Sequence, residues 1–83
     1  MRIIAVDDEK IALEALANAI KAVVAEDEVI SFRYPEDAIE YAAENLCDIA
    51  FLDIEMAGMS GVELAEELKK YNSEINIVFC TGY

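Results

Sequence analysis

Residues 49–53 read IAFLD, four apolar side chains followed by the carboxylate of Asp53. A strand that is apolar at every position predicts burial on both faces, which is typical of a parallel sheet covered by helices. The same pattern recurs where the apolar residues 3–6 lead into Asp7 and Asp8. Because ligands in such sheets lie at the carboxyl ends of the strands, we expect these three carboxylates to meet at one edge.

Strands and helices alternate along the rest of the chain. Strands are predicted at residues 2–6, 29–33, 49–52 and 75–80, and helices at residues 10–24, from Pro35 onward and from Ser60 onward. Apolar residues at helical spacing predict the buried stripes of the helices: Leu13, Leu16, Ala17, Ile20 and Val24; Ile39, Ala42, Ala43 and Leu46; Val62, Leu64, Ala65 and Leu68. Short connections between such elements predict right-handed βαβ units, and therefore an α/β fold with helices on both faces of a parallel sheet.

Residues that typically begin helices or interrupt strands support these boundaries. Pro35 suits the first turn of a helix, and Ser60 with Glu63 three residues later is a capping-box signal. Ser31 and Arg33 interrupt the apolar pattern of the second strand. We therefore expect that strand to lie at an edge of the sheet.

Composition limits the classes of function. The chain has 83 residues and a net charge of −12, which favours one small domain or part of one. Such an acidic segment is not expected to bind nucleic acid or an anionic membrane, because that binding requires clustered cations. No apolar run is long enough to span a membrane and no signal peptide is evident, so we expect a cytoplasmic protein. Cys47 and Cys80 lack metal-ligand spacing and are expected to be free thiols.

Carboxylates brought together at a sheet edge need a compensating charge. Two unit charges ~4 Å apart repel by about 4 kcal/mol at the effective dielectric of a protein site. Mg2+ is the hard cation best suited to this task, because it takes one or two carboxylates and leaves positions open for water and phosphate. A lone aspartate after the first strand would more often cap the following helix, but two in a row beside Asp53 favour the metal site.

Four segments resemble the receiver domain of two-component response regulators. They are VDDE at residues 6–9, FLDIEM at 51–56, GMSG at 58–61 and FCTG at 79–82. The resemblance implies a flavodoxin-like (CheY-like) fold with strand order 2-1-3-4. It also implies that Asp53 is the phosphoacceptor and that Thr81 binds a phosphoryl oxygen as a switch residue.

The resemblance further implies a Mg2+ site. Asp8 and Asp53 would be direct ligands, Asp7 a ligand through water, and Glu55 a ligand through its main-chain carbonyl. The chain contains no histidine, so the phosphoryl donor must be a separate histidine kinase or phosphotransfer protein. The controlled output would commonly be a transcription regulator on another domain.

The chain departs from the family pattern at two places. Ala57 stands where most receivers have proline, which we expect to loosen the loop without touching the chemistry. The family's fifth strand, its lysine and the last two helices have no counterpart within residues 1–83, so we expect a partial receiver domain. Interior sequence at residues 75–80 would then form an unpaired edge, which predicts a homodimer or swapped assembly.

Other interpretations stay open at this point. A truncated or engineered receiver fragment would fold or self-associate without competent phosphotransfer, and whether the chain acts as an enzyme is left undecided. A phosphatase of the haloacid dehalogenase type would place its nucleophile after the first strand, where Asp7-Asp8-Glu9-Lys10 does not fit its Asp-x-Asp-x-Thr pattern. A flavin mononucleotide site is also disfavoured, because these acids would repel the phosphate.

Overall fold

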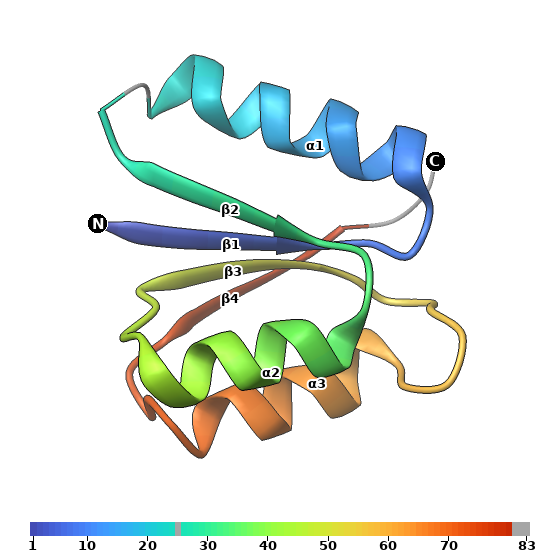
Figure 1. Ribbon diagram of the computed structural model, residues 1–83, viewed down its shortest axis with the longest axis vertical. Helices are drawn as coiled ribbons and strands as arrows, with labels where there is room; N and C mark the ends of the chain where they lie inside the picture. Colours follow the sequence, from blue (N-terminus) through green and yellow to red (C-terminus); the bar gives the residue numbers. More distant parts are fainter. Residues whose placement is uncertain (25, 81–83) are drawn as a thin grey trace.

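The sheet and its helices follow the predicted order. The computed structural model describes residues 1–24 and 26–80 (Figure 1). Its elements are β1 (Arg2–Val6), α1 (Lys10–Val23), β2 (Glu28–Phe32), α2 (Pro35–Glu44), β3 (Ile49–Asp53), α3 (Gly61–Lys69) and β4 (Asn76–Cys80). The strands pair in parallel in the order β2-β1-β3-β4, which confirms both the predicted topology and the edge position of β2.

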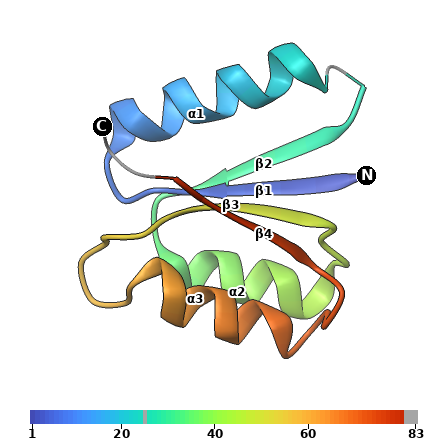
Figure 2. The same cartoon turned by 180° about the vertical axis from the view of Figure 1, so that it is seen from behind.

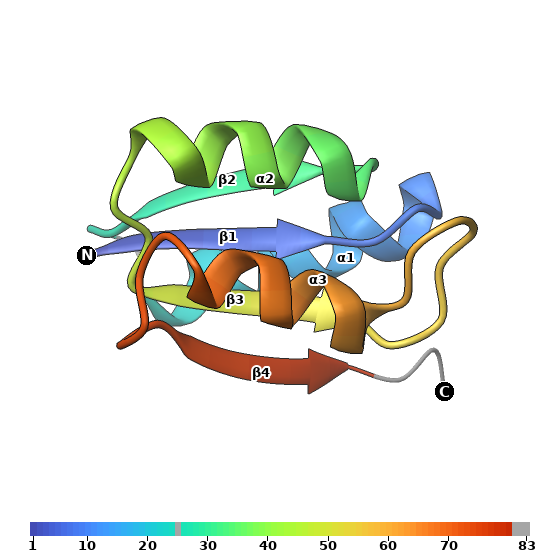
Figure 3. The same ribbon diagram turned by 90° about the horizontal axis from the view of Figure 1, so that it is seen from below.

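The helices cover both faces of the sheet, as expected. α1 lies alone on one face, and α2 and α3 lie side by side on the other (Figures 1 and 2). α2 packs over β1 and β2, whereas α3 packs over β3 (Figure 3). The carboxyl ends of the strands therefore open at a single edge, next to the loops that lead into the helices.

The central strand β1 supplies both halves of the core. Ile4 and Val6 face α2 and α3 within the larger apolar cluster, and Ile3 and Ala5 face α1 within the smaller one. All four side chains are at most 1% exposed. Alternating side chains of a doubly covered strand must be apolar on both faces, which is why residues 3–6 carry no polar residue.

Three residues of the predicted helical stripes are exposed instead of buried. Leu46 is 63% exposed because α2 ends at Glu44 and the chain turns to extended backbone at Asn45, where helical spacing no longer applies. Val62, at 51%, and Ala43 lie on the solvent side of their helices. The remaining members of the stripes are buried or half-buried, so the helix faces were predicted correctly.

A capping box fixes the beginning of α3. The Ser60 hydroxyl accepts a hydrogen bond from the Glu63 amide at 3.1 Å, and the Glu63 carboxylate accepts one from the Ser60 amide at 3.0 Å. Such caps contribute on the order of 1 kcal/mol. The predicted cap is confirmed, and it fixes one end of the loop that leaves β3.

The outer strand β4 is the least covered part of the described sheet. Val78 and Phe79 are 40% and 44% exposed, and an apolar groove of about 350 Å³ runs between α1 and β3–β4, lined in part by Ile20, Phe51 and Cys80. The homodimer or swapped assembly expected from this strand stays a prediction, because the structure contains a single chain.

The two cysteines are free thiols, as predicted. Cys47 is 2% exposed, and burial raises its pKa. Among the helices within the described residues, none combines the length and the apolar character needed to cross a membrane.

Candidate phosphoacceptor and metal site

Three carboxylates meet at the carboxyl edge of the sheet. β1 and β3 are neighbours, with Val6 opposite Leu52, so the residues that follow each of these positions emerge side by side. Asp7, Asp8 and Asp53 each place a carboxylate oxygen within 4.8 Å of the other two, and all three residues are half-buried. The parallel register thus produces the predicted cluster.

Neither Asp7 nor Asp8 caps the first helix. The N-cap of α1 is Glu9, and its side chain makes no capping hydrogen bond. The Asp7 carboxylate instead accepts a hydrogen bond from the Glu9 amide at 3.0 Å. The capping interpretation is therefore not supported, and both carboxylates stay at the sheet edge.

The Asp8 carboxylate is held from a different loop. Its Oδ2 accepts a hydrogen bond from the Ala57 amide at 2.9 Å. This contact requires a residue other than proline, because proline has no N–H donor. The expectation that alanine at position 57 leaves the chemistry untouched stays a prediction. Reasoning from side chains missed the contact, because the group involved belongs to the main chain.

A positive charge also reaches the rim of the site. The Arg33 guanidinium, on the connection between β2 and α2, donates to the Asp8 carbonyl oxygen at 3.4 Å. It also lies 5.7 Å from the centre of the Tyr34 ring. Sequence reasoning treated Arg33 only as a polar interruption of an edge strand, so its place beside the acidic cluster was not predicted.

The fold disfavours the ionised form of the Asp53 carboxyl group. Its pKa is raised, first by burial and then by the Asp7 and Asp8 charges, while backbone hydrogen bonds from Glu55 and Ile54 act in the opposite direction. A raised carboxyl pKa means that ionising Asp53 costs more free energy in the folded chain than in the unfolded chain. A bound cation would remove that penalty.

The donor set fits Mg2+. Three hard carboxylate oxygens at the carboxyl ends of two adjacent strands are close enough to share one ion, and all three residues are only half-buried. Two other predicted site residues are not placed by this geometry. Glu55 lies in the loop after β3 with an exposed side chain, and its carbonyl stays a predicted ligand; Thr81 lies outside the described residues.

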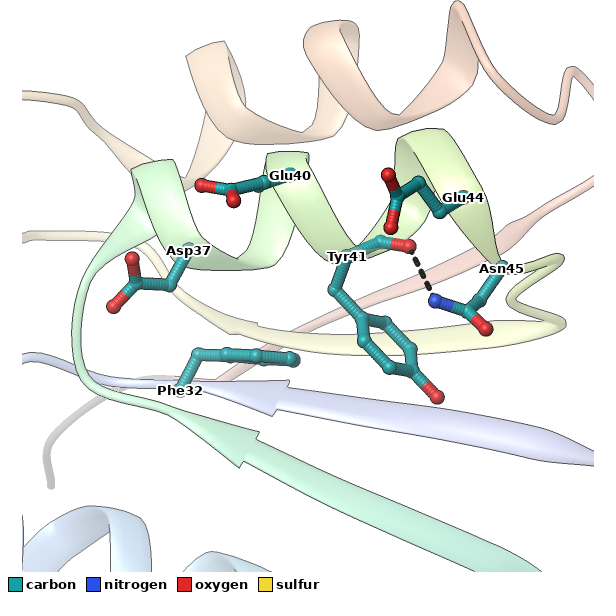
Figure 4. A pocket seen from close by; sticks show the side chains of 6 residues that line it. All are labelled: Phe32, Asp37, Glu40, Tyr41, Glu44 and Asn45. Carbon is teal, nitrogen blue, oxygen red and sulfur yellow. Dashed lines mark hydrogen bonds between the residues drawn. The ribbon is translucent and has the colours of Figure 1, made fainter.

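A pocket between the end of β2 and α2 has a different character from the carboxylate cluster. The Phe32 and Tyr41 rings lie 5.4 Å apart at its base (Figure 4). Carboxylates of α2 flank them, and the side-chain amide of Asn45 donates to the Tyr41 carbonyl at 3.0 Å (Figure 4). These acids would repel a phosphate, and no residue of the carboxylate cluster lines this pocket.

Comparison with known proteins gives a consistent result. The family model for the response regulator receiver domain matches residues 3–83. Sensory transduction protein LytT of Bacillus subtilis is 34% identical over 83 residues, which cover 100% of this chain and 34% of LytT. The chain thus spans about a third of the length of the curated relatives it matches.

Solved structures agree with that match. The crystal structure of response regulator protein TrrA from Thermotoga maritima in complex with Mg2+-BeF has a TM-score of 0.85 and 33% identity, covering 99% of this chain and 70% of that one. The structure of TrrA in complex with the histidine kinase ThkA gives a TM-score of 0.82 and 33% identity, and the match covers 99% of this chain and 69% of that one.

A parallel sheet of order 2-1-3-4, covered on both faces and acidic at its carboxyl edge, defines a CheY-like, flavodoxin-like receiver fold. The chain belongs to the response regulator receiver domain family of two-component signalling. This membership replaces the phosphatase and flavin-binding alternatives.

Gly61 is expected to be essential for the packing of α3 beneath Asp53. A Cβ at position 61 would collide with the Asp53 carbonyl oxygen and lie 3.0 Å from Ile54 Cα, so the helix would have to move away. We predict that Gly61→Ala lowers the free energy of unfolding by about 2–3 kcal/mol, as overpacking does. Urea unfolding measures it.

Gly58→Ala is the matched control. Position 58 has open space around it but a positive φ of 86°, which costs an alanine roughly 1–2 kcal/mol. A smaller loss for Gly61→Ala than for Gly58→Ala would contradict the close approach of α3 to β3.

The raised pKa of Asp53 predicts that neutralising this side chain stabilises the fold, by an amount that depends on pH. The folded chain binds this proton more tightly than the unfolded chain, so stability falls as pH rises from the ordinary carboxyl pKa through the raised one. Asp53→Asn should therefore be more stable than the parent chain at pH 7 in chelator. We expect a gain below about 1 kcal/mol, because solvent screens a half-buried group.

The gain should shrink as the pH falls toward about 4, where the aspartate itself becomes neutral. Thermal unfolding at several pH values measures it, with exposed Glu66→Gln as the control. A less stable Asp53→Asn chain at pH 7 would show that the hydrogen bonds to the carboxylate outweigh the repulsion.

Proposed function

We propose that this receiver domain accepts a phosphoryl group on Asp53 in a Mg2+-dependent reaction. The observation that carries the proposal is the meeting of Asp7, Asp8 and Asp53 within 4.8 Å at the carboxyl ends of two adjacent strands. Asp53 is the proposed nucleophile because it ends the buried strand β3 and lies at the centre of the sheet edge between β1 and β4.

The transfer is an in-line displacement at phosphorus. An Asp53 carboxylate oxygen attacks the phosphorus of a phosphohistidine, a P–O bond forms as the P–N bond breaks, and the imidazole nitrogen leaves with its electron pair. The product is an acyl phosphate. Mg2+ would be held by Asp8 and Asp53, with Asp7 through water and the Glu55 carbonyl, and would neutralise charge on the phosphoryl oxygens.

The comparisons support a donor and an output for this reaction. A histidine kinase is the proposed donor, because this chain lacks histidine and the related TrrA forms a complex with the histidine kinase ThkA. Control of transcription is the proposed output, since relatives include the transcriptional regulatory proteins NatR of Bacillus subtilis and YpdB of Escherichia coli. Thr81 is the proposed contact to the phosphoryl group, and we place the pathway in the cytoplasm.

Phosphorylation at Asp53 is directly testable. Incubation with a small-molecule phosphodonor and Mg2+ should add one phosphoryl group, located at Asp53 by mass spectrometry of peptides. The label should disappear in Asp53→Asn and in excess chelator, and should persist in Asp37→Asn, which changes an exposed carboxylate on α2. Equal labelling of the parent chain and Asp53→Asn would refute the assignment.

A further inference from the structure

One hydrogen bond ties the two loops of the proposed metal site together. The Ala57 amide donates to Asp8 Oδ2 at 2.9 Å, across 49 positions of sequence. Ala57 lies in the loop between β3 and α3, and Asp8 lies between β1 and α1. The Ala57 side chain is exposed, so the main-chain N–H is the group that this position contributes to the site.

The loop that carries this donor is itself fixed at its far end. The Gly61 amide donates to the Ile54 carbonyl at 2.8 Å, and the capping box of Ser60 holds the first turn of α3. The Ala57 N–H is therefore presented from a closed loop of defined shape. Asp7, in contrast, is held by the Glu9 amide within its own loop.

A hydrogen bond to one oxygen leaves the carboxylate able to bind a cation. An ionised aspartate offers two oxygens with about four lone-pair sites, so Oδ2 can accept from Ala57 while the other oxygen stays available. Hydrogen bonds to an ionised acceptor are shorter and stronger than neutral ones. The Ala57 N–H thus fixes the direction in which Asp8 presents its remaining oxygen.

We propose that the Ala57 main-chain amide is a positioning group for Asp8 in Mg2+ binding. The inference rests on the proposed function, because it assumes that Asp8 binds the ion. Partners that orient a metal ligand typically change metal affinity by about 10- to 100-fold when lost. Because the Asp8 contact is solvent-accessible, we expect the lower end of that range.

The test removes the donor in two independent ways. Ala57→Pro deletes the N–H by substitution, and an ester in place of the 57 amide deletes it without a proline ring. Native chemical ligation at Cys47 gives access to the ester in the full 83-residue chain. Ala57→Gly is the matched control, because it keeps the N–H and removes only an exposed methyl group.

The measurement is a Mg2+ titration followed by the backbone amide signals near Asp53. We expect Ala57→Gly to match the parent chain within about twofold, and both donor-free chains to bind Mg2+ about tenfold more weakly. The amide spectrum without metal establishes that each variant is folded. If Ala57→Pro does not fold, the ester chain decides the question.

Three outcomes would overturn the proposal. Unchanged affinity in the ester chain would show that the hydrogen bond is not used, and tighter binding would show that the amide competes with the ion for Asp8. Weak binding in Ala57→Pro together with normal binding in the ester would assign the effect to the proline ring. Absence of Mg2+ binding in the parent chain would instead refute the proposed metal site, and this inference with it.

Discussion

Mutual repulsion of three carboxylates is the constraint around which this domain is organised. The parallel register of β1 and β3 brings Asp7, Asp8 and Asp53 to the same edge, where their carboxylate oxygens lie within 4.8 Å of one another. The apolar strands make the arrangement possible. Burial of residues 3–6 between two helical layers stabilises the fold, and this stabilisation offsets the repulsion among the carboxylates. The penalty is visible in the raised pKa of Asp53.

Main-chain N–H groups, more than any side chain, stabilise the charge of these carboxylates. Amides of Glu9 and Ala57 donate to Asp7 and Asp8, and backbone hydrogen bonds from the loop after β3 partly offset the penalty at Asp53. Fixed N–H dipoles reduce the repulsion without neutralising it. The site therefore keeps an excess of negative charge, which supports the proposed binding of Mg2+ and the proposed Mg2+ dependence of phosphorylation.

The elements and the cluster were predictable from the sequence because both depend on patterns along the chain. Continuous apolar strands and helical spacing predicted the four strands, the first helix and the starts of the other two helices to within a residue, and acids at strand ends predicted the meeting of the three carboxylates. The features that the sequence did not predict have a different origin. Leu46 kept helical spacing after the helix had ended, and the contacts of Ala57 and Arg33 join loops that only the folded chain brings together. No periodicity encodes such a contact.

The strands of the sheet are buried unequally. Leu52 of β3 is fully buried, and so is Leu64 of α3 in the same apolar cluster, whereas β4 has three exposed residues and none that is fully buried. Asp53 pairs with Cys80 in that strand, and the Ile54 amide donates to the Cys80 carbonyl at 3.4 Å. Elements with few buried contacts open and shift at the lowest cost in free energy. Of the two strands that pair with β3, β4 is therefore the one that the described core restrains least, because β1 is buried at residues 3–6 and β4 has no buried residue.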